Sequence, residues 1–257
     1  MSFNTCSAGA LTGTEFCLIF APSKGYDEPE ILPCSIRSIC PIGADDGHFR
    51  SSSAYRVRIA LNLKRQAVAY DYVGVNFREN EQRTSSYLAI NPQALVPSLV
   101  VDSAVLTQSL AIIGWLDETH PEPPLLPKEP LGRATERAFA LSIVADIQPL
   151  NNLRVLDYLK GPLGIDQTGV DAWYRQWATA GLAACEALAT RTRSYGVFAF
   201  GDRPTLADIC LVPQMYNARR FDCDLGPMPR LRAIDDACAA LPEFADAHPD
   251  RQPDAVP

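Results

Sequence analysis

Three consecutive serines, Ser51–Ser53, stand directly before a segment with the apolar spacing of a helix, Arg56–Leu63. Serine hydroxyls at such a position can cap the first turn of the helix. The same hydroxyls, together with the free amides of that turn, can instead stabilise an anion such as a thiolate. The spacing leaves both roles open, and different serines can have different roles.

Three arginines, Arg50, Arg154 and Arg220, are candidates for binding a carboxylate. A planar guanidinium group holds a carboxylate through two parallel hydrogen bonds, and it also stabilises the negative charge of an enolate. An exposed ion pair on a helix surface is the alternative for each of the three. The residues alone leave both roles open for each of the three arginines.

The segment that would position the serines alternates between helix and strand patterns from residue 49 to residue 120. Apolar periodicity and turn residues predict a helix, a strand, two further strands joined by a tight turn at Asp102-Ser103, and a second helix. These elements are expected at 56–63, 69–75, 95–101, 104–106 and 109–118. Their order indicates a small mixed α/β domain, which we place at residues 48–120.

The segment 121–130 contains five prolines, which cannot continue a helix and which suit a stiff linker. Residues 131–257 form the next predicted domain, and its pattern is almost wholly helical. Long periodic stretches run through 132–160 and 168–190. Thr205 and Asp208 have the spacing of a capping box, so another helix is predicted to begin there.

Residues 1–47 are rich in Cys, Pro, Gly and Ser, and we predict an irregular N-terminal extension there. One run within it, Phe16–Phe20, has the pattern of a strand. The stretch directly before Phe49 contains Asp45-Asp46-Gly47, and these residue types are unfavourable in a strand.

Composition argues against several kinds of function. A hydrophobic fraction of 47% is that of a globular protein with a core, and a net charge of −7 argues against binding to nucleic acid or to an anionic membrane. No apolar stretch approaches the roughly 20 residues that span a bilayer. The eight cysteines and three histidines lack metal-ligand spacing. We therefore expect no metal site and, without the basic segment of a signal peptide, a cytoplasmic protein with reduced thiols.

Five blocks of the sequence share an order and a spacing with a known family. The first block, 50–61, reads Arg-Ser-Ser-Ser-Ala-Tyr-Arg-Val-Arg-Ile-Ala-Leu. The other blocks are 91–99, 107–113, 147–152 and 217–221. Together they resemble the zeta class of the glutathione transferase family, and the resemblance covers roughly residues 49–254.

This resemblance implies an α/β, thioredoxin-like N-terminal domain followed by an all-helical glutathione transferase C-terminal domain. It implies a homodimer that uses glutathione as a cis–trans isomerase of a small unsaturated dicarboxylate, a dioxo acid of the maleylpyruvate or maleylacetoacetate type. Reversible addition of a thiolate would let the double bond rotate, and glutathione is the expected thiol. The alternatives are a glutathione transferase or enone isomerase of secondary metabolism, and a non-catalytic glutathione-fold binding protein.

The resemblance also implies roles for individual residues. The catalytic group comprises Arg50, Ser51, Ser52 and Ser53, with the glutathione sulfur beside Ser52. The groups around glutathione are Val96, Pro97 (as a cis proline), Gln108, Ser109, Gln148 and Asn152. The substrate would meet Arg50, Arg154 and Arg220. Simple helix capping or helix packing is the alternative for the serines and the amides.

Two features depart from the pattern of the family. Ser53 stands where the family usually has a cysteine, which weakens any redox role. The first strand of the family should end directly before Phe49, where this chain has poor strand residues.

Overall fold

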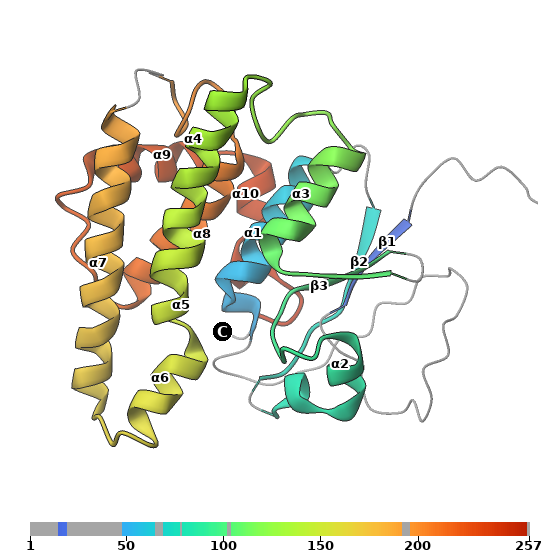
Figure 1. Cartoon of the computed structure of the whole chain (residues 1–257), viewed down its shortest axis with the longest axis vertical. Helices are drawn as coiled ribbons and strands as arrows, with labels where there is room; N and C mark the ends of the chain where they lie inside the picture. The colour runs from blue at the N-terminus through green and yellow to red at the C-terminus, as the bar shows by residue number, and fades with distance from the viewer. Residues whose placement is uncertain are drawn as a thin grey trace, which may run out of the picture.

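A four-stranded sheet organises the first half of the molecule (Figure 1). Its strands are β1 Glu15–Ile19, β2 Ala69–Tyr72, β3 Ser98–Val101 and β4 Ala104–Thr107. They lie in the order β2-β1-β3-β4, with β1 parallel to β2 and antiparallel to β3, and with β4 antiparallel to β3. The computed structural model describes residues 15–19, 48–64, 69–77, 79–101, 104–191 and 196–255.

The first strand of the sheet comes from the segment that we expected to be an irregular extension. β1 pairs on both sides, with Leu18 opposite Tyr72 of β2 and opposite Leu99 of β3. The strand-like run predicted at Phe16–Phe20 therefore belongs to the sheet, between β2 and β3. The strand predicted within this segment is confirmed, and it spans Glu15–Ile19. Residues 1–14 and 20–47 lie outside the described part of the chain, as does the turn predicted at Asp102-Ser103, so the irregular character of the rest of 1–47 stays a prediction.

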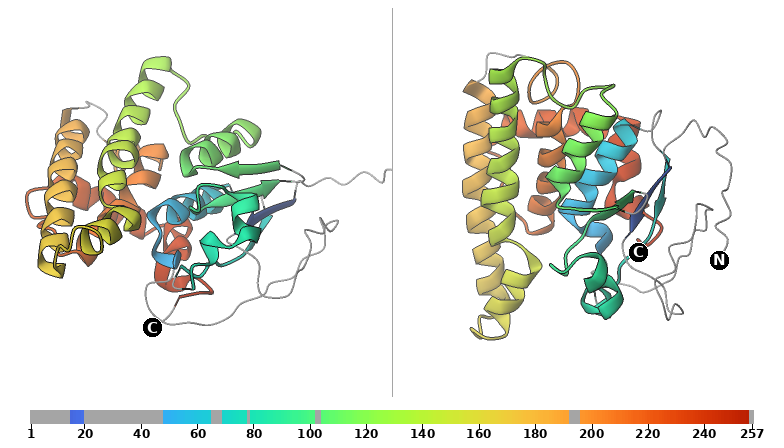
Figure 2. Two further views of the ribbon diagram at one scale, coloured as in Figure 1. Left: turned by 60° about the horizontal axis from the view of Figure 1, so that its bottom comes forward. Right: turned by 45° about the vertical axis from the view of Figure 1, so that its right-hand side comes forward.

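Helices cover the face of the sheet that is turned toward the second half of the chain (Figure 2). The helices of the first half are α1 Ser52–Leu63, α2 Ser85–Ile90 and α3 Ser109–Thr119, with single turns η1 His48–Arg50 and η2 Glu81–Arg83. Helices α1 and α3 contact each other and lie between the sheet and the helical half. This arrangement confirms the expected thioredoxin-like domain.

The second half is built from helices, and an isolated bridge between Phe198 and Gly201 is its only β pairing within the described residues. Its elements are α4 Pro130–Leu141, the π-helical turn η3 Ser142–Ile147, α5 Gln148–Leu150, α6 Leu153–Lys160, α7 Gln167–Arg191, α8 Leu206–Arg220, α9 Pro229–Ala239, α10 Pro242–Ala247 and η4 Pro249–Arg251. The periodic stretch predicted over 132–160 is helical but not continuous, because Asn152 caps a new helix with its side chain. The capping box of Thr205 and Asp208 is confirmed.

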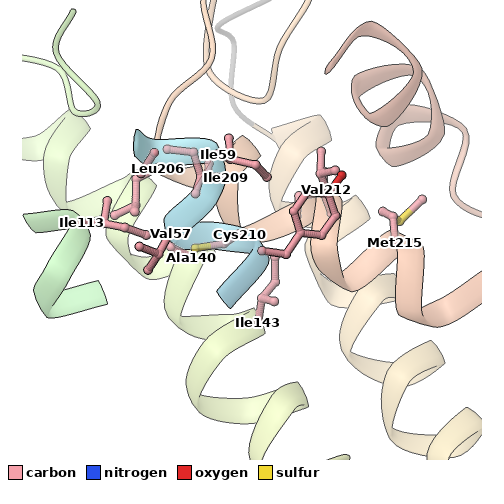
Figure 3. Packing of buried hydrophobic residues seen from close by; sticks show 14 of the residues in the cluster. Val57, Ile59, Ile113, Ala140, Ile143, Leu206, Ile209, Cys210, Val212 and Met215 are labelled. Carbon is pink, nitrogen blue, oxygen red and sulfur yellow. The ribbon is translucent and has the colours of Figure 1, made fainter. Parts of the chain in front are cut away.

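The two halves share one hydrophobic core, which fixes their relative position. Figure 3 shows Val57 of α1, Ile113 of α3, Ala140 of α4 and Cys210 of α8 gathered between the halves. The proline-rich segment is also packed, since Leu125 is 1% exposed. No described helix is both long enough and apolar enough to cross a membrane.

Candidate active site

A cavity of about 460 Å³ opens where the two halves meet, beside the first turn of α1. Nearly all of the predicted site residues line it: Arg50, Ser51, Ser52, Ser53, Val96, Pro97, Gln108, Ser109, Gln148, Asn152 and Arg220. Residues that sequence reasoning did not assign to the site complete the wall: Phe77, Asn91, Gln93, Leu95, Asn151, Leu153, Leu156, Lys160, Gln167, Val170, Tyr174, Gln214, Asn217 and Phe221.

Arg154 is the predicted site residue that does not line the cavity. It is exposed on the second position of α6. Leu153, Leu156 and Lys160 face the cavity from this helix at the spacing of one helical face, and Arg154 lies about 100° away from Leu153 around the axis. The structure therefore favours the exposed-arginine alternative for this residue.

The three serines at the start of α1 have different partners. Ser51 is the N-cap and accepts a bond from the backbone N–H of Ala54 at 3.4 Å. Ser52 is buried, and its Oγ accepts a bond of 2.5 Å from Nδ2 of Asn217. Ser53 Oγ accepts from Arg56 at 3.0 Å and from Gln148 Nε2 at 2.8 Å. Ser51 thus caps the helix, while Ser52 and Ser53 bond to side chains from the helical half.

Arg56 holds the cavity wall together from behind. It is 1% exposed, and its guanidinium donates to Ser53, to Ser109 at 3.0 and 3.2 Å, and to Oε1 of Gln148 at 2.6 Å. These partners come from α1, α3 and α5, so one side chain joins both halves of the molecule. Sequence reasoning noted Arg56 only as part of a block. A buried cation whose side-chain hydrogen bonds within the described chain all go to neutral oxygens also makes the adjacent cavity favourable for an anion.

The cavity wall carries positive charge in a chain whose net charge is −7. The described residues that line it include Arg50, Lys160 and Arg220, but no aspartate or glutamate. The guanidinium of Arg220 lies over the ring of Phe221 at 5.7 Å, and that ring stacks on Tyr174 at 3.6 Å. Burial raises the pKa of Tyr174, which therefore stays a neutral phenol. An anionic ligand is favoured electrostatically here.

A second region of the wall offers backbone groups to a ligand. The peptide bond between Val96 and Pro97 is cis, as predicted, and both residues border the cavity. Neither backbone group of Val96 hydrogen-bonds within the described residues. Gln108 precedes α3 with φ +69°, a strained value for a residue with a side chain, and it does not cap the helix. The first amides of α3 are thus left for an anionic group.

These features fit glutathione, a peptide with two carboxylates and a thiol. The uncapped α3 suits a carboxylate, and the backbone of Val96 suits an extended peptide. Two buried polar atoms among the cavity residues, Nε2 of Gln214 and Oδ1 of Asn151, have no hydrogen-bond partner in the described chain. Such atoms are costly unless a ligand or water binds them.

A family model, related sequences and solved structures all indicate the same family. Residues 48–124 match the family model of the glutathione S-transferase N-terminal domain. The chain is 46% identical over 208 residues to a maleylpyruvate isomerase from Ralstonia sp, covering 81% of this chain and 97% of that protein. It is 47% identical over 210 residues to a maleylacetoacetate isomerase from Pseudomonas aeruginosa, which covers 80% of this chain and 96% of that protein.

Solved structures are similar over most of their length. The holo structure of a maleylpyruvate isomerase, described as a bacterial zeta-class glutathione S-transferase, has a TM-score of 0.79 at 46% identity, with 81% of this chain and 97% of that chain covered. A maleylacetoacetate isomerase from Anaeromyxobacter dehalogenans with glutathione bound in its active site has a TM-score of 0.75 at 40% identity, with 95% and 99% covered. This chain therefore belongs to the zeta class of the glutathione transferase family, together with the maleylpyruvate and maleylacetoacetate isomerases.

Proposed function

We propose that this protein is a glutathione-dependent cis–trans isomerase of a small unsaturated dioxo acid of the maleylpyruvate or maleylacetoacetate type. One observation carries the proposal: Arg50, Arg220 and the serine hydroxyls of α1 line the same cavity, with no described carboxylate among its lining residues. Groups that bind a carboxylate and groups that stabilise a thiolate are thereby brought within one small space.

When bound, glutathione supplies a thiolate that adds reversibly to the conjugated double bond, so that the bond can rotate. The protein has to bind this tripeptide, lower the pKa of its thiol and hold the acid. For binding, we assign the backbone of Val96 beside Pro97, the start of α3 at Gln108 and Ser109, and the amides Gln148 and Asn152.

Thiol activation falls to the first turn of α1. A free thiol has a pKa of about 8.5, and each unit of lowering requires about 1.4 kcal/mol of preference for the thiolate. Ser52 and Ser53 line the cavity with hydroxyl groups, the first amides of α1 contribute the positive end of the helix dipole, and buried Arg56 adds a nearby positive charge. Together these groups favour the ionised thiol at neutral pH.

Binding of the acid falls to Arg50 and Arg220. Each guanidinium can hold a carboxylate or an enolate oxygen through charge-assisted hydrogen bonds. Among described residues that line the cavity, no aspartate, glutamate, histidine or cysteine competes as base or nucleophile. We therefore assign charge stabilisation to the protein.

The test is an isomerase assay with maleylpyruvate and maleylacetoacetate side by side, with and without glutathione. We expect turnover of at least one acid that depends strictly on glutathione. Equal rates without glutathione would contradict the proposal. Binding of glutathione with no turnover of either acid would favour the non-catalytic alternative.

We further propose that the protein is a cytoplasmic homodimer with the four segments 1–47, 48–120, 121–130 and 131–257 as its units, the first of which supplies β1. β4 is an edge strand with Val105 42% exposed, and Leu131 and Leu141 of α4 are 73% and 46% exposed. Apolar side chains of this size on an edge strand and a helix suit burial against a second copy. Sedimentation of the purified chain tests the dimer, and a monomer at micromolar concentration would contradict it. Cell fractionation tests the location.

A further inference from the structure

Two arginines each donate a hydrogen bond to the oxygen of a side-chain amide. The nitrogen of the same amide donates to a serine in the first turn of α1. Arg220 Nη1 lies 3.4 Å from Oδ1 of Asn217, and Nδ2 of Asn217 donates to Ser52 Oγ at 2.5 Å. On the second path, Arg56 donates to Oε1 of Gln148, and Nε2 of Gln148 donates to Ser53 Oγ. Both amides come from the helical half and both serines come from α1.

The arginines determine which way the amides point. A guanidinium group has donors and no acceptor, so it selects the oxygen of the carboxamide. If Asn217 were turned over, its NH₂ group would face the NH₂ groups of Arg220, and its oxygen would face Ser52. The amide of Asn217 is therefore fixed as a donor toward Ser52.

A fixed donor determines the direction of the serine proton. A hydroxyl has one proton and two lone pairs, and Ser52 uses a lone pair for Asn217. Within the described chain, the Ser52 hydroxyl donates to no acceptor. Ser52 is 6% exposed and lines the cavity, so its proton is available to a ligand there. A sulfur anion is the ligand that this site is proposed to bind.

We propose that Asn217 is a positioning residue that directs the Ser52 proton toward the sulfur of bound glutathione and thereby lowers the pKa of that thiol. The inference rests on the proposed function of the cavity. It assigns to the helical half a part in thiol activation, because Asn217 belongs to the last turn of α8. Asn217 itself acts through Ser52.

The pH dependence of the site can be interpreted because few other groups titrate around Asn217 and Ser52. The cationic side chains that line the cavity are Arg50, Lys160 and Arg220, and burial raises the pKa of Tyr174, which also approaches Asn217. No described aspartate, glutamate, histidine or cysteine lines the cavity. A titration near neutral pH in the glutathione complex therefore belongs to the thiol.

The experiment is a double-mutant cycle with Asn217→Ala and Ser52→Ala. The pKa of bound glutathione is measured from the ultraviolet absorbance of the thiolate as a function of pH, and the dissociation constant is measured by calorimetry. We expect Asn217→Ala to raise the thiol pKa by about 0.4–1, which corresponds to one net hydrogen bond. The dissociation constant at a pH below the thiol pKa should change less than two-fold. In the Ser52→Ala background, Asn217→Ala should leave the thiol pKa unchanged.

Asn62→Ala is the matched control. Asn62 also lies on a helix, and within the described chain its side chain makes one hydrogen bond, from Nδ2 to the carbonyl of Glu243 at 2.9 Å, but it does not line the cavity. It should lose a similar amount of stability and keep the thiol pKa of the wild type. Asn217→Asp is a second variant of the same shape, and it should raise the thiol pKa more than Asn217→Ala does.

The outcomes separate two kinds of failure. If wild-type protein binds glutathione with a lowered thiol pKa and Asn217→Ala keeps that value, the positioning role of Asn217 is wrong while the proposed function stands. If Asn217→Ala raises the pKa equally with and without Ser52, the effect does not pass through Ser52, and the inference is again wrong. If the wild-type protein does not lower the thiol pKa at all, the proposed function fails and this inference fails with it.

Discussion

The two walls of the cavity differ in how firmly their side chains are held. On the wall of α1, α3 and α5, Arg56 ties Ser53, Ser109 and Gln148 into one hydrogen-bonded group. On the wall of α6 and α7, Leu153, Leu156 and Val170 are apolar, and the side chain of Lys160 forms no hydrogen bond within the described chain. The first wall suits a ligand of constant shape, such as glutathione. The second can accept changes, so it suits the selection of an acid.

The largest effect is expected when Arg56 is replaced, because Arg56 holds the side chains of the first wall together. Arg56→Met would leave the hydroxyls of Ser53 and Ser109 and the amide of Gln148 without their buried donor. We expect the free energy of unfolding to fall by about 2–5 kcal/mol and glutathione binding to weaken at least ten-fold. Urea unfolding and calorimetry measure the two quantities.

Arg58 provides the matched control for Arg56. It is 0% exposed on the same helix, but it donates to the carbonyls of Ala247 and Phe49, away from the cavity. Arg58→Met should cost comparable stability without weakening glutathione binding in the folded fraction. Equal loss of glutathione affinity in both variants would show that the two walls respond only to overall stability.

The next effect separates two arginines that the sequence could not rank. Arg220→Ala removes a cation that lines the cavity, so kcat/KM for the acid should fall about 10–150-fold, as for loss of a hydrogen bond to a charged group. Arg154→Ala removes an exposed side chain outside the cavity and should change kcat/KM less than two-fold. Equal losses in the two variants would restore Arg154 to the binding site.

Sequence patterns could predict the fold because its strongest signals are local. The apolar spacing of 56–63 and the capping box at Thr205 each depend on a few neighbouring residues, whereas the cis proline at Pro97 is implied by the resemblance to the family. The position of β1 could not be predicted in this way. Its run at Glu15–Ile19 is separated by many residues from the helix that it precedes in the fold, and only pairing with β2 and β3 assigns it to the sheet.

The site was predictable where it follows the chain and unpredictable where it depends on distant contacts. Ser51–Ser53 and Arg50 are adjacent in sequence and also in the cavity. Arg154 and Lys160 lie on the same helix, and only the rotation of α6 determines that Lys160 faces the cavity. The bond from Asn217 to Ser52 joins residues 165 positions apart, and no local pattern indicates it.

A third prediction concerns a buried carboxyl group outside the cavity, in the contact between α4 and α8. Burial raises the pKa of Glu136 to about 7, and that of Asp208 nearby to about 6. The folded state therefore holds the proton of Glu136 more tightly than the unfolded chain does, and the free energy of unfolding should decline as the pH rises from 4.5 to about 7. Glu136→Gln should be more stable than the wild type by about 1–3 kcal/mol at pH 8 and nearly equal to it at pH 4.5.

Urea unfolding at several pH values measures this difference. Glu129 gives a control of opposite sign, because its carboxylate accepts bonds from the amides of Leu131 and Gly132, which lower its pKa. Glu129→Gln should have a lower free energy of unfolding than the wild type at neutral pH, and the two proteins should become equally stable in acid. The thiol pKa of bound glutathione should be unaffected by either variant, because neither residue lines the cavity. A Glu136→Gln protein with the pH dependence of the wild type would contradict the assignment.

The smallest expected effect tests the apolar wall directly. Leu153 is 52% exposed and lines the cavity, so Leu153→Ala removes only part of a buried side chain, worth about 0.5–1 kcal/mol. The KM of the acid should rise about two- to five-fold, while the dissociation constant of glutathione stays unchanged. Leu163→Ala, at 55% exposed and outside the cavity, should change neither quantity. If Leu153→Ala weakened glutathione more than the acid, the division of the cavity into a glutathione wall and an acid wall would be wrong.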